Sequence, residues 1–401
     1  MKNYSLYIIL TSLLLLTNNR VSLNDPLVML AAGDSYSYFE IAQSFPDLPS
    51  KQITFHHAQR FMIPYIIGFI YNITGIPIES LFYYVVIILV CATIFVVHQT
   101  LKSLNLCAMN ELLSLSLIIF NPYFFRFYIT FPGMINDLFF NLGLSITLLS
   151  LTNKRSCSLF VGILLCSVSR QTALMIIIPT AVWICIDWKQ KNLTKLSIIS
   201  FFTLFIISYY FISGKVASIF SSESRNFEHI TGIVPWLFNG FNIKELLMFI
   251  FRWLIPFIMP LALYFGIIFS TKDGVKDFEQ NKIVLLVTFF LFLIAQPIMA
   301  GPAITGGNIQ RLCLPALLPF IMAFSVITNN VMKKLETNHN FQLFIIIELL
   351  IFSGSMHHLY SFYQPAPDQT LYFCFFYILS SCFVFFTMIY MTRHISATSL
   401  S

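Results

Sequence analysis

Residues 79–100 read ESLFYYVVIILVCATIFVVHQT, a stretch with one Glu and no Asp, Lys or Arg. A helix needs about 20 mostly apolar residues to cross a bilayer core, and similar apolar runs recur along the 401 residues. The whole chain is 57% hydrophobic and 10% charged, whereas about a quarter of the residues of a soluble protein are charged. The composition therefore predicts an all-α polytopic membrane protein.

Apolar runs separated by short polar stretches predict about twelve transmembrane helices in one transmembrane domain, residues 1–401, with no separate soluble domain. The first run is interpreted as a retained span rather than a signal peptide. Residues 61–74 are too short to span and are interpreted as a juxtamembrane or re-entrant piece. Residues 20–78 then form the first outer loop, with short juxtamembrane helices. The spans are placed near 4–19, 79–100, 108–125, 137–152, 156–169, 171–187, 196–213, 246–269, 283–300, 312–329, 342–356 and 371–391.

Lys and Arg are distributed differently over this topology. With a cytoplasmic N-terminus, 11 of the 14 Lys fall inside, as the positive-inside rule expects, while seven of the nine Arg fall outside. Arg carries a planar fork of donors that suits phosphate and carboxylate groups. The outer arginines therefore indicate recognition of an anionic group on the outer face, or else they snorkel to lipid headgroups. The basic residues lie in separate loops, so the net charge of +6 does not indicate nucleic-acid binding.

The first outer loop contains GDSYSYFEIAQSFPDLPSKQITFHHAQRFMIPYIIG, residues 33–68, and concentrates ionisable side chains. Residues 34–45 have helical spacing of apolar side chains, which predicts an amphipathic helix along the outer membrane surface with Asp34 at its N-cap. Asp34 is then either a catalytic carboxylate or only a helix cap. In HHAQRF, His56 and Arg60 are four residues apart and share a helical face. The substrate-site candidates in this loop are Glu40, His56, His57 and Gln59.

Further candidates lie near the outer ends of later spans. Arg126 and Asp137 flank the third and fourth spans, Arg170 breaks two apolar runs in SVSRQTAL, and Arg311 follows a Gly-rich turn at 300–308. Glu348 lies in the middle of a predicted span, where an acid is costly and usually functional. No metal-ligand signature is present, so no metal-binding residues are assigned, and a divalent metal remains open as a cofactor.

The early outer Asp, the short helix that follows it, the broken SRQTAL helix pair and RLCLPALLP at 311–319 together resemble the GT-C superfamily of membrane glycosyltransferases. By that resemblance the chain transfers a hexose or pentose from a polyprenyl-phosphate-linked donor to a lipid, glycan or protein acceptor. Asp34 takes the role of catalytic base, Asp137 matches a second outer acid, and Arg311 clamps the donor phosphate. Arg60, Arg126 and Arg170 are further phosphate-binding candidates. Asp34 is followed by Ser35 rather than by the second acid seen in some members, and the sugar and acceptor stay open.

The resemblance implies a location in the bacterial inner membrane with the active face outside the cytoplasm. Two other classes remain in view. A surface-polysaccharide polymerase or ligase is also polytopic with outer arginines, but its decisive loop would be 214–245 here. A lipid-glycan transporter predicts an internal duplication and charges near the bilayer midplane.

Overall fold

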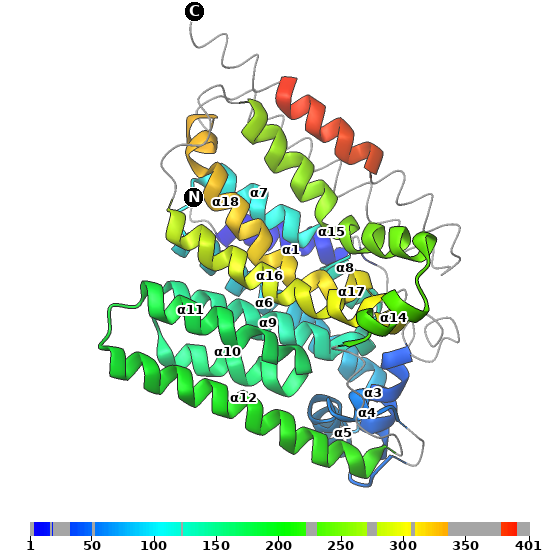
Figure 1. Ribbon diagram of the computed structural model, residues 1–401. Coiled ribbons are helices and arrows are strands. Elements are labelled where there is room, and N and C mark those ends of the chain that lie inside the picture. The colour runs from blue at the N-terminus through cyan, green and yellow to red at the C-terminus, as the bar shows by residue number, and fades with distance from the viewer. Residues whose placement is uncertain are drawn as a thin grey trace, which may run out of the picture. The chain divides into compact units, whose positions relative to one another are not determined.

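The computed structural model of the chain describes residues 4–16, 18, 33–49, 53–121, 123–221, 231–270, 279–305, 309–335 and 378–390. The regular elements among these residues are all helices, as the composition predicts (Figure 1). The chain divides into two compact units. Unit 1 contains residues 1–17, 98–126 and 231–401, and unit 2 contains residues 18–97 and 127–230.

Six described segments are helical, long and apolar enough to cross a bilayer. Each coincides with a predicted span, which supports a multi-pass membrane protein. They are α6 (Ile78–Ser103), η1 (Pro132–Met134) with α9 (Ile135–Thr152), α12 (Asn192–Phe220), α15 (Ile243–Ser270), α16 (Gln280–Thr305), and the segment from Arg311 in α17 (Ile309–Cys313) through η4 (Leu314–Ala316) and α18 (Leu317–Leu335).

The prediction of twelve spans is wrong for the part of the chain that the structure describes. Four expected spans are helices too short to cross, because a helix rises 1.5 Å per residue and the bilayer core is about 30 Å thick. Expected span 342–356, with Glu348, lies outside the described residues, and 371–391 is described only as a short helix from Ile378 to Tyr390. Hydropathy does not show where a helix ends inside an apolar run, and for the helix over residues 108–119 it also does not separate a buried apolar helix from a lipid-facing one. The four short helices are α1 (Tyr4–Leu16), α7 (Ala108–Ile119), α10 (Ser156–Ser169) and α11 (Ile177–Asp187).

Unit 1 is built around α18, which packs against α7, α15 and α16. α14 (Ile233–Asn239) packs against α16, and α1 against α7. A buried hydroxyl group from each of three helices joins the core, since Ser114 Oγ lies 3.0 Å from Tyr264 Oη and 2.6 Å from Ser325 Oγ. Near the start of α7, Glu111 Oε1 lies 2.5 Å from the buried His98 Nε2 of α6.

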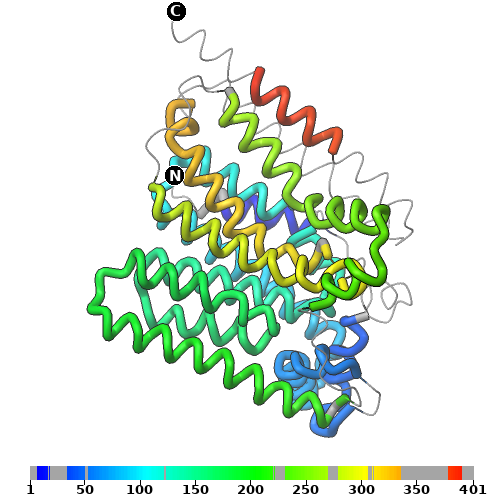
Figure 2. The backbone as a smooth tube through the Cα atoms, in the orientation of Figure 1, coloured from blue at the N-terminus to red at the C-terminus, as the bar shows by residue number. Residues whose placement is uncertain are grey.

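Unit 2 contains a series of helices that run back and forth from α9 through α12 (Figure 2). α9 and α10 form a tight pair because glycines face each other across it. A Cβ on Gly143 would lie 2.8 Å from the carbonyl oxygen of Gly162, and one on Gly162 would lie 2.6 Å from Thr147 Oγ1. Small residues at such crossings let helix backbones approach closely in membranes. α10 and α11 are separated by the 3-10 turn η2 (Gln171–Ile176), and α12 packs against both of them.

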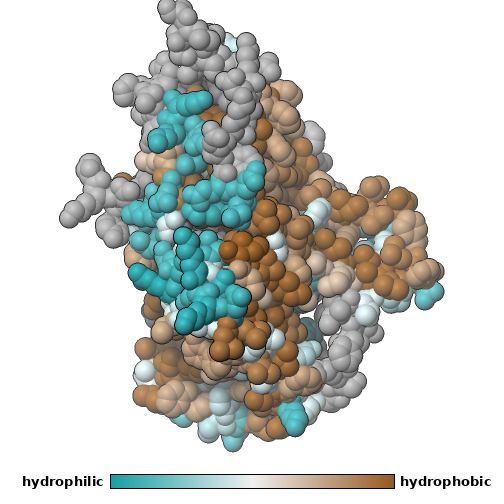
Figure 3. All heavy atoms as spheres, turned by 60° about the vertical axis from the view of Figure 1, so that its left-hand side comes forward, coloured by the Kyte–Doolittle hydropathy of each residue, from teal (hydrophilic) through white to brown (hydrophobic). Residues whose placement is uncertain are grey.

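The surface of α12 is strongly apolar, with Leu193, Leu204 and Phe211 all more than half exposed. Wide hydrophobic areas also cover the face seen in Figure 3, with hydrophilic side chains gathered in a separate band. Exposed apolar surface on this scale is expected of helices that face lipid rather than water.

The segment predicted as the first outer loop contains α3 (Gly33–Ser44), α4 (Phe55–Ala58) and α5 (Met62–Thr74). α5 is too short to span, as predicted for 61–74. The apolar face of α3 packs against protein, because Tyr38, Ile41 and Ala42 are buried and α3 contacts α5 and η1. Gly133 in η1 allows this packing, since a Cβ there would lie 2.4 Å from Ser35 Cβ.

Candidate active site

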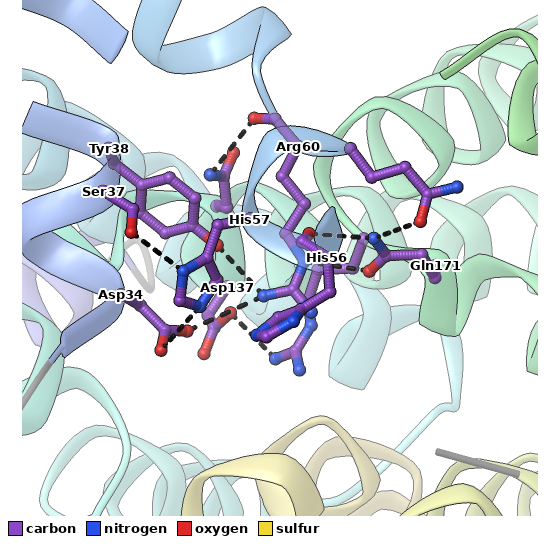
Figure 4. A network of polar contacts seen from close by, with 11 residues as sticks. Asp34, Ser37, Tyr38, His56, His57, Arg60, Asp137 and Gln171 are labelled. Atoms are coloured by element: carbon purple, nitrogen blue, oxygen red, sulfur yellow. Dashed lines mark hydrogen bonds and ion pairs between the residues drawn. The ribbon is translucent and has the colours of Figure 1, made fainter. Parts of the chain in front are cut away.

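Four of the residues predicted from the sequence gather in unit 2 as a buried cluster of two acids and two arginines. Asp34, Arg60, Asp137 and Arg170 come from four separate places in the chain, and each is at most 9% exposed (Figure 4). Burial of this many ionisable groups is costly unless they pair with one another. The sequence reasoning selected all four, and their contacts show how they are paired.

Asp137 and Arg170 meet because α9 and α10 are joined by the short turn 153–155, which brings the start of α9 to the end of α10. Arg170 Nη1 lies 2.8 Å from Asp137 Oδ1, and both side chains are almost fully buried. Arg170 itself is extended, with φ −151° and ψ 147°, and it separates α10 from η2. Asp137 lies in the first turn of α9, where the helix dipole favours a negative charge.

Asp34 was predicted at the N-cap of its helix, but it lies in the first turn of α3. Its Oδ1 lies 3.0 Å from His57 Nε2 and its Oδ2 lies 3.7 Å from Arg60 Nη1. The shorter of the two contacts makes His57 the nearer ionisable partner of Asp34. The expectation that His56 and Arg60 share a helical face is also wrong, because α4 ends at Ala58 and the neighbouring His57 contacts the acid.

Arg60 connects the acids to a set of amide side chains. Its Nη1 donates to Tyr38 Oη at 3.0 Å and its Nε donates to Gln171 Oε1 at 2.9 Å. Gln171 Nε2 in turn donates to Gln59 Oε1 at 2.8 Å and to the backbone carbonyl of His56 at 3.1 Å. His56 therefore takes part in this hydrogen-bond network through its backbone carbonyl.

The sequence reasoning missed Tyr38, Ser37 and Gln171 as site residues. Ser37 and Tyr38 lie three and four residues after Asp34, so on a helix they share its face. Gln171 follows Arg170 directly at the break between two apolar runs. Helical spacing from Asp34 could therefore have identified Ser37 and Tyr38 as site residues.

The electrostatics of the cluster favour a neutral tyrosine and a balanced charge. Burial is the largest cause that raises the pKa of Tyr38; Arg60 opposes it, and Asp34 and Asp137 add to it. Tyr38 therefore keeps its phenolic proton at neutral pH. Two carboxylates face two guanidinium groups, so the charges of these four side chains balance.

A hollow adjoins the cluster on the side of Arg60 and Arg170. Its cavity volume is about 10 Å³, about the space of one water molecule, and it is partly open to the outside. Both arginines line it, and Asp34, His57 and Asp137 lie behind them. Gln59 fixes one wall by donating from Nε2 to the carbonyl of Tyr210 in α12 at 3.2 Å. The other polar side chains on the walls are those of Ser167, Gln171, Tyr209, Tyr210 and Ser213.

A second hollow, with a cavity volume of about 10 Å³, lies between α10, α11 and α12 and shares Ile206 with the first. Its lining is apolar apart from two threonines. The two hollows thus follow one face of α12, the first polar and the second apolar. This arrangement suits an amphiphile with an anionic head and an apolar tail.

The remaining predicted residues lie elsewhere. Glu40 is half-buried further along α3. Arg126, at the start of α8 (Phe125–Thr130), and Arg311 in α17 are both buried and belong to unit 1. The cluster of unit 2 therefore contains two of the four predicted phosphate-binding arginines. Among the residues that the structure describes, no three His, Cys, Asp or Glu side chains gather as a metal site would.

No protein-family model and no curated protein sequence matches this chain.

Proposed function

We propose that the protein is an integral-membrane glycosyltransferase that uses a polyprenyl-phosphate-linked sugar, with unit 2 holding the donor phosphate. The observation that carries this proposal is the role of Arg60, which lines the hollow and also lies 3.7 Å from Asp34. A phosphate in the hollow would contact the guanidinium groups of Arg60 and Arg170, which can bind it from two directions. The apolar lining of the second hollow suits the first part of an isoprenoid chain, which requires the hollow to widen.

The chemistry is displacement at the anomeric carbon. The acceptor hydroxyl loses its proton, its oxygen bonds to the sugar carbon, and the bond from that carbon to the phosphate oxygen breaks. Asp34 is the carboxylate on which removal of the proton depends, and a well-placed base contributes about two to four orders of magnitude. The arginines stabilise the negative charge that grows on the departing phosphate in a buried setting.

The opposite end of unit 2 supports an orientation with the cluster facing away from the cytoplasm. Lys154 lies in the turn between α9 and α10, and its Nζ lies 3.4 Å from Asp187 Oδ2 at the end of α11. Lys195 in the first turn of α12 donates to the carbonyl of Cys185 at 2.9 Å. Lys154 and Lys195 thus lie at the end away from Arg170, as positive-inside orientation requires, whereas Lys215 lies near the other end of α12.

The function is tested by supplying proteoliposomes with a panel of polyprenyl-phosphate hexoses and pentoses and measuring released polyprenyl phosphate. Ser213 is buried in the wall of the hollow, whereas Ser218, also on α12, is exposed. Ser213→Phe should fill the hollow and abolish release, while Ser218→Phe should behave as wild type.

Release that is unchanged in Ser213→Phe would contradict the placement of the donor, and no release from any donor by wild type would contradict the function. The orientation is tested separately, in intact cells. A single cysteine at position 154 should resist a membrane-impermeant thiol reagent added outside, and its labelling would overturn the proposed sidedness.

A further inference from the structure

Asp34, His57 and Ser37 form a continuous chain of contacts within the cluster. His57 Nε2 lies 3.0 Å from Asp34 Oδ1, and His57 Nδ1 lies 2.9 Å from Ser37 Oγ (Figure 4). Asp34 and Ser37 are three residues apart on α3, so both face α4 and hold the imidazole from two sides. The ring of Tyr38 closes a third side, edge-on at 5.6 Å between centroids. The imidazole is therefore fixed in position and orientation.

The Asp34–His57–Ser37 contacts can accept one more proton. With Asp34 ionised, the proton of a neutral His57 is best placed on Nε2, which faces the carboxylate, and Nδ1 then accepts from the Ser37 hydroxyl. A hydroxyl can both donate and accept. If His57 gains a second proton on Nδ1, Ser37 can turn and accept from it without losing the contact.

Asp34 is by contrast poorly suited to keep a proton. Its Oδ1 faces His57 and its Oδ2 is close to Arg60, and nearby positive groups favour the charged form of a carboxylate. The titratable and charged groups around His57 are Asp34 and Tyr38 on α3, Arg60 after α4 and His56 on its own helix, with Asp137 acting on Tyr38 and Arg60.

We infer that Asp34 and His57 act as one proton acceptor, in which Asp34 orients the imidazole and the proton comes to rest on Nδ1 of His57. The identity of the acceptor substrate rests on the proposed function. As the acceptor oxygen bonds to the sugar, its proton passes to Ser37 Oγ while Ser37 gives its own proton to Nδ1. The phosphate leaves with the bonding electron pair, and His57 later releases the proton to water.

The inference is tested first without any substrate. In protein labelled with ¹⁵N-histidine, the signals that disappear in His57→Gln identify His57. Above neutral pH they should show the proton on Nε2, and acidification should add a proton to Nδ1. Asp34→Asn should remove the preference for the Nε2 form. A neutral His57 that carries its proton on Nδ1 would overturn the inference.

Activity gives the second test. Gln at position 57 can still donate to Asp34 but cannot take a proton, so His57→Gln should lower turnover about 100-fold and remove the loss of activity on the acid side. Donor KM should change little. Ser218→Ala, at an exposed position on α12, is the control and should keep the wild-type profile.

Ser37→Ala provides a second variant if His57→Gln does not fold, and it should also slow transfer. Wild-type turnover with an unchanged acid limb in both variants would contradict the relay. Absence of transfer by wild type with every donor would count against the proposed function, and the substrate-free spectra would still decide whether the pair exists.

Discussion

At the scale of single residues, the geometry of Arg60 explains why an arginine is required at this position. Its Nε and Nη1 reach Gln171 and Tyr38 at the same time, and Nη1 is also the group near Asp34. A lysine carries one compact ammonium group and cannot hold two such partners at fixed angles.

Arg60→Lys should therefore lose most transfer activity and weaken donor binding, although the charge is kept. Each lost hydrogen bond from a charged group costs about 1.5–3 kcal/mol, so the melting temperature should also fall. Arg155→Lys is the control, because Arg155 is exposed in the turn at the opposite end of α10. Equal activity in the two variants would show that Arg60 acts only as a positive charge.

The residue scale is also where the sequence was most informative. Asp34, Arg60, Asp137 and Arg170 were selected because ionisable groups are rare in this chain and costly in a membrane. Their pairing was not predictable, because it depends on which helix ends meet. The choice between His56 and His57 failed for a similar reason, since it rested on a helix through Arg60 and α4 ends two residues earlier.

At the scale of secondary-structure elements, the α9–α10 pair sets the distance between Asp137 and Arg170. The two helices approach closely at Gly143 and Gly162, where a Cβ on either glycine would come within 2.8 Å of the other helix. A larger side chain must push the helices apart, because the atoms it would meet include backbone.

Gly162→Leu should therefore destabilise unit 2 by about 1–3 kcal/mol through overpacking and reduce transfer by disturbing the Asp137–Arg170 pair. Val161→Leu is the matched control, since Val161 is its neighbour on α10 and 46% exposed. Thermal unfolding in detergent and the release assay measure both effects. A Gly162→Leu protein as stable and active as Val161→Leu would show that the close crossing is not needed.

Elements were predictable where an apolar run was long, as for α6, α12, α15 and α16. Short runs misled, because α7 is apolar for burial in unit 1 and not for contact with lipid. Its end at Ile119 precedes Asn121 and a proline, which stop a helix. The burial of α3 was missed because an apolar stripe does not reveal whether it faces lipid or protein.

At the scale of the whole molecule, the sequence predicted an all-α membrane protein from composition, and the described residues agree. The division into two units was not predictable from hydropathy, because both units consist of equally apolar helices and each is assembled from separated parts of the chain. The unequal distribution of Lys and Arg was visible in the sequence, and in unit 2 Lys154 and Lys195 lie at the end of the helical series opposite Arg170.

The central claim is that Asp34 serves the chemistry of this protein and not merely its fold. The most direct measurement is turnover of the donor by Asp34→Asn in proteoliposomes. Asp187→Asn is the control, because Asp187 pairs with Lys154 and both side chains are half-exposed. Asn keeps the size of Asp and its carbonyl can still accept from His57, so the variant should fold and bind donor. We predict a loss of turnover of at least about 100-fold in Asp34→Asn and none in Asp187→Asn. Near-normal turnover by a folded Asp34→Asn protein would contradict the account.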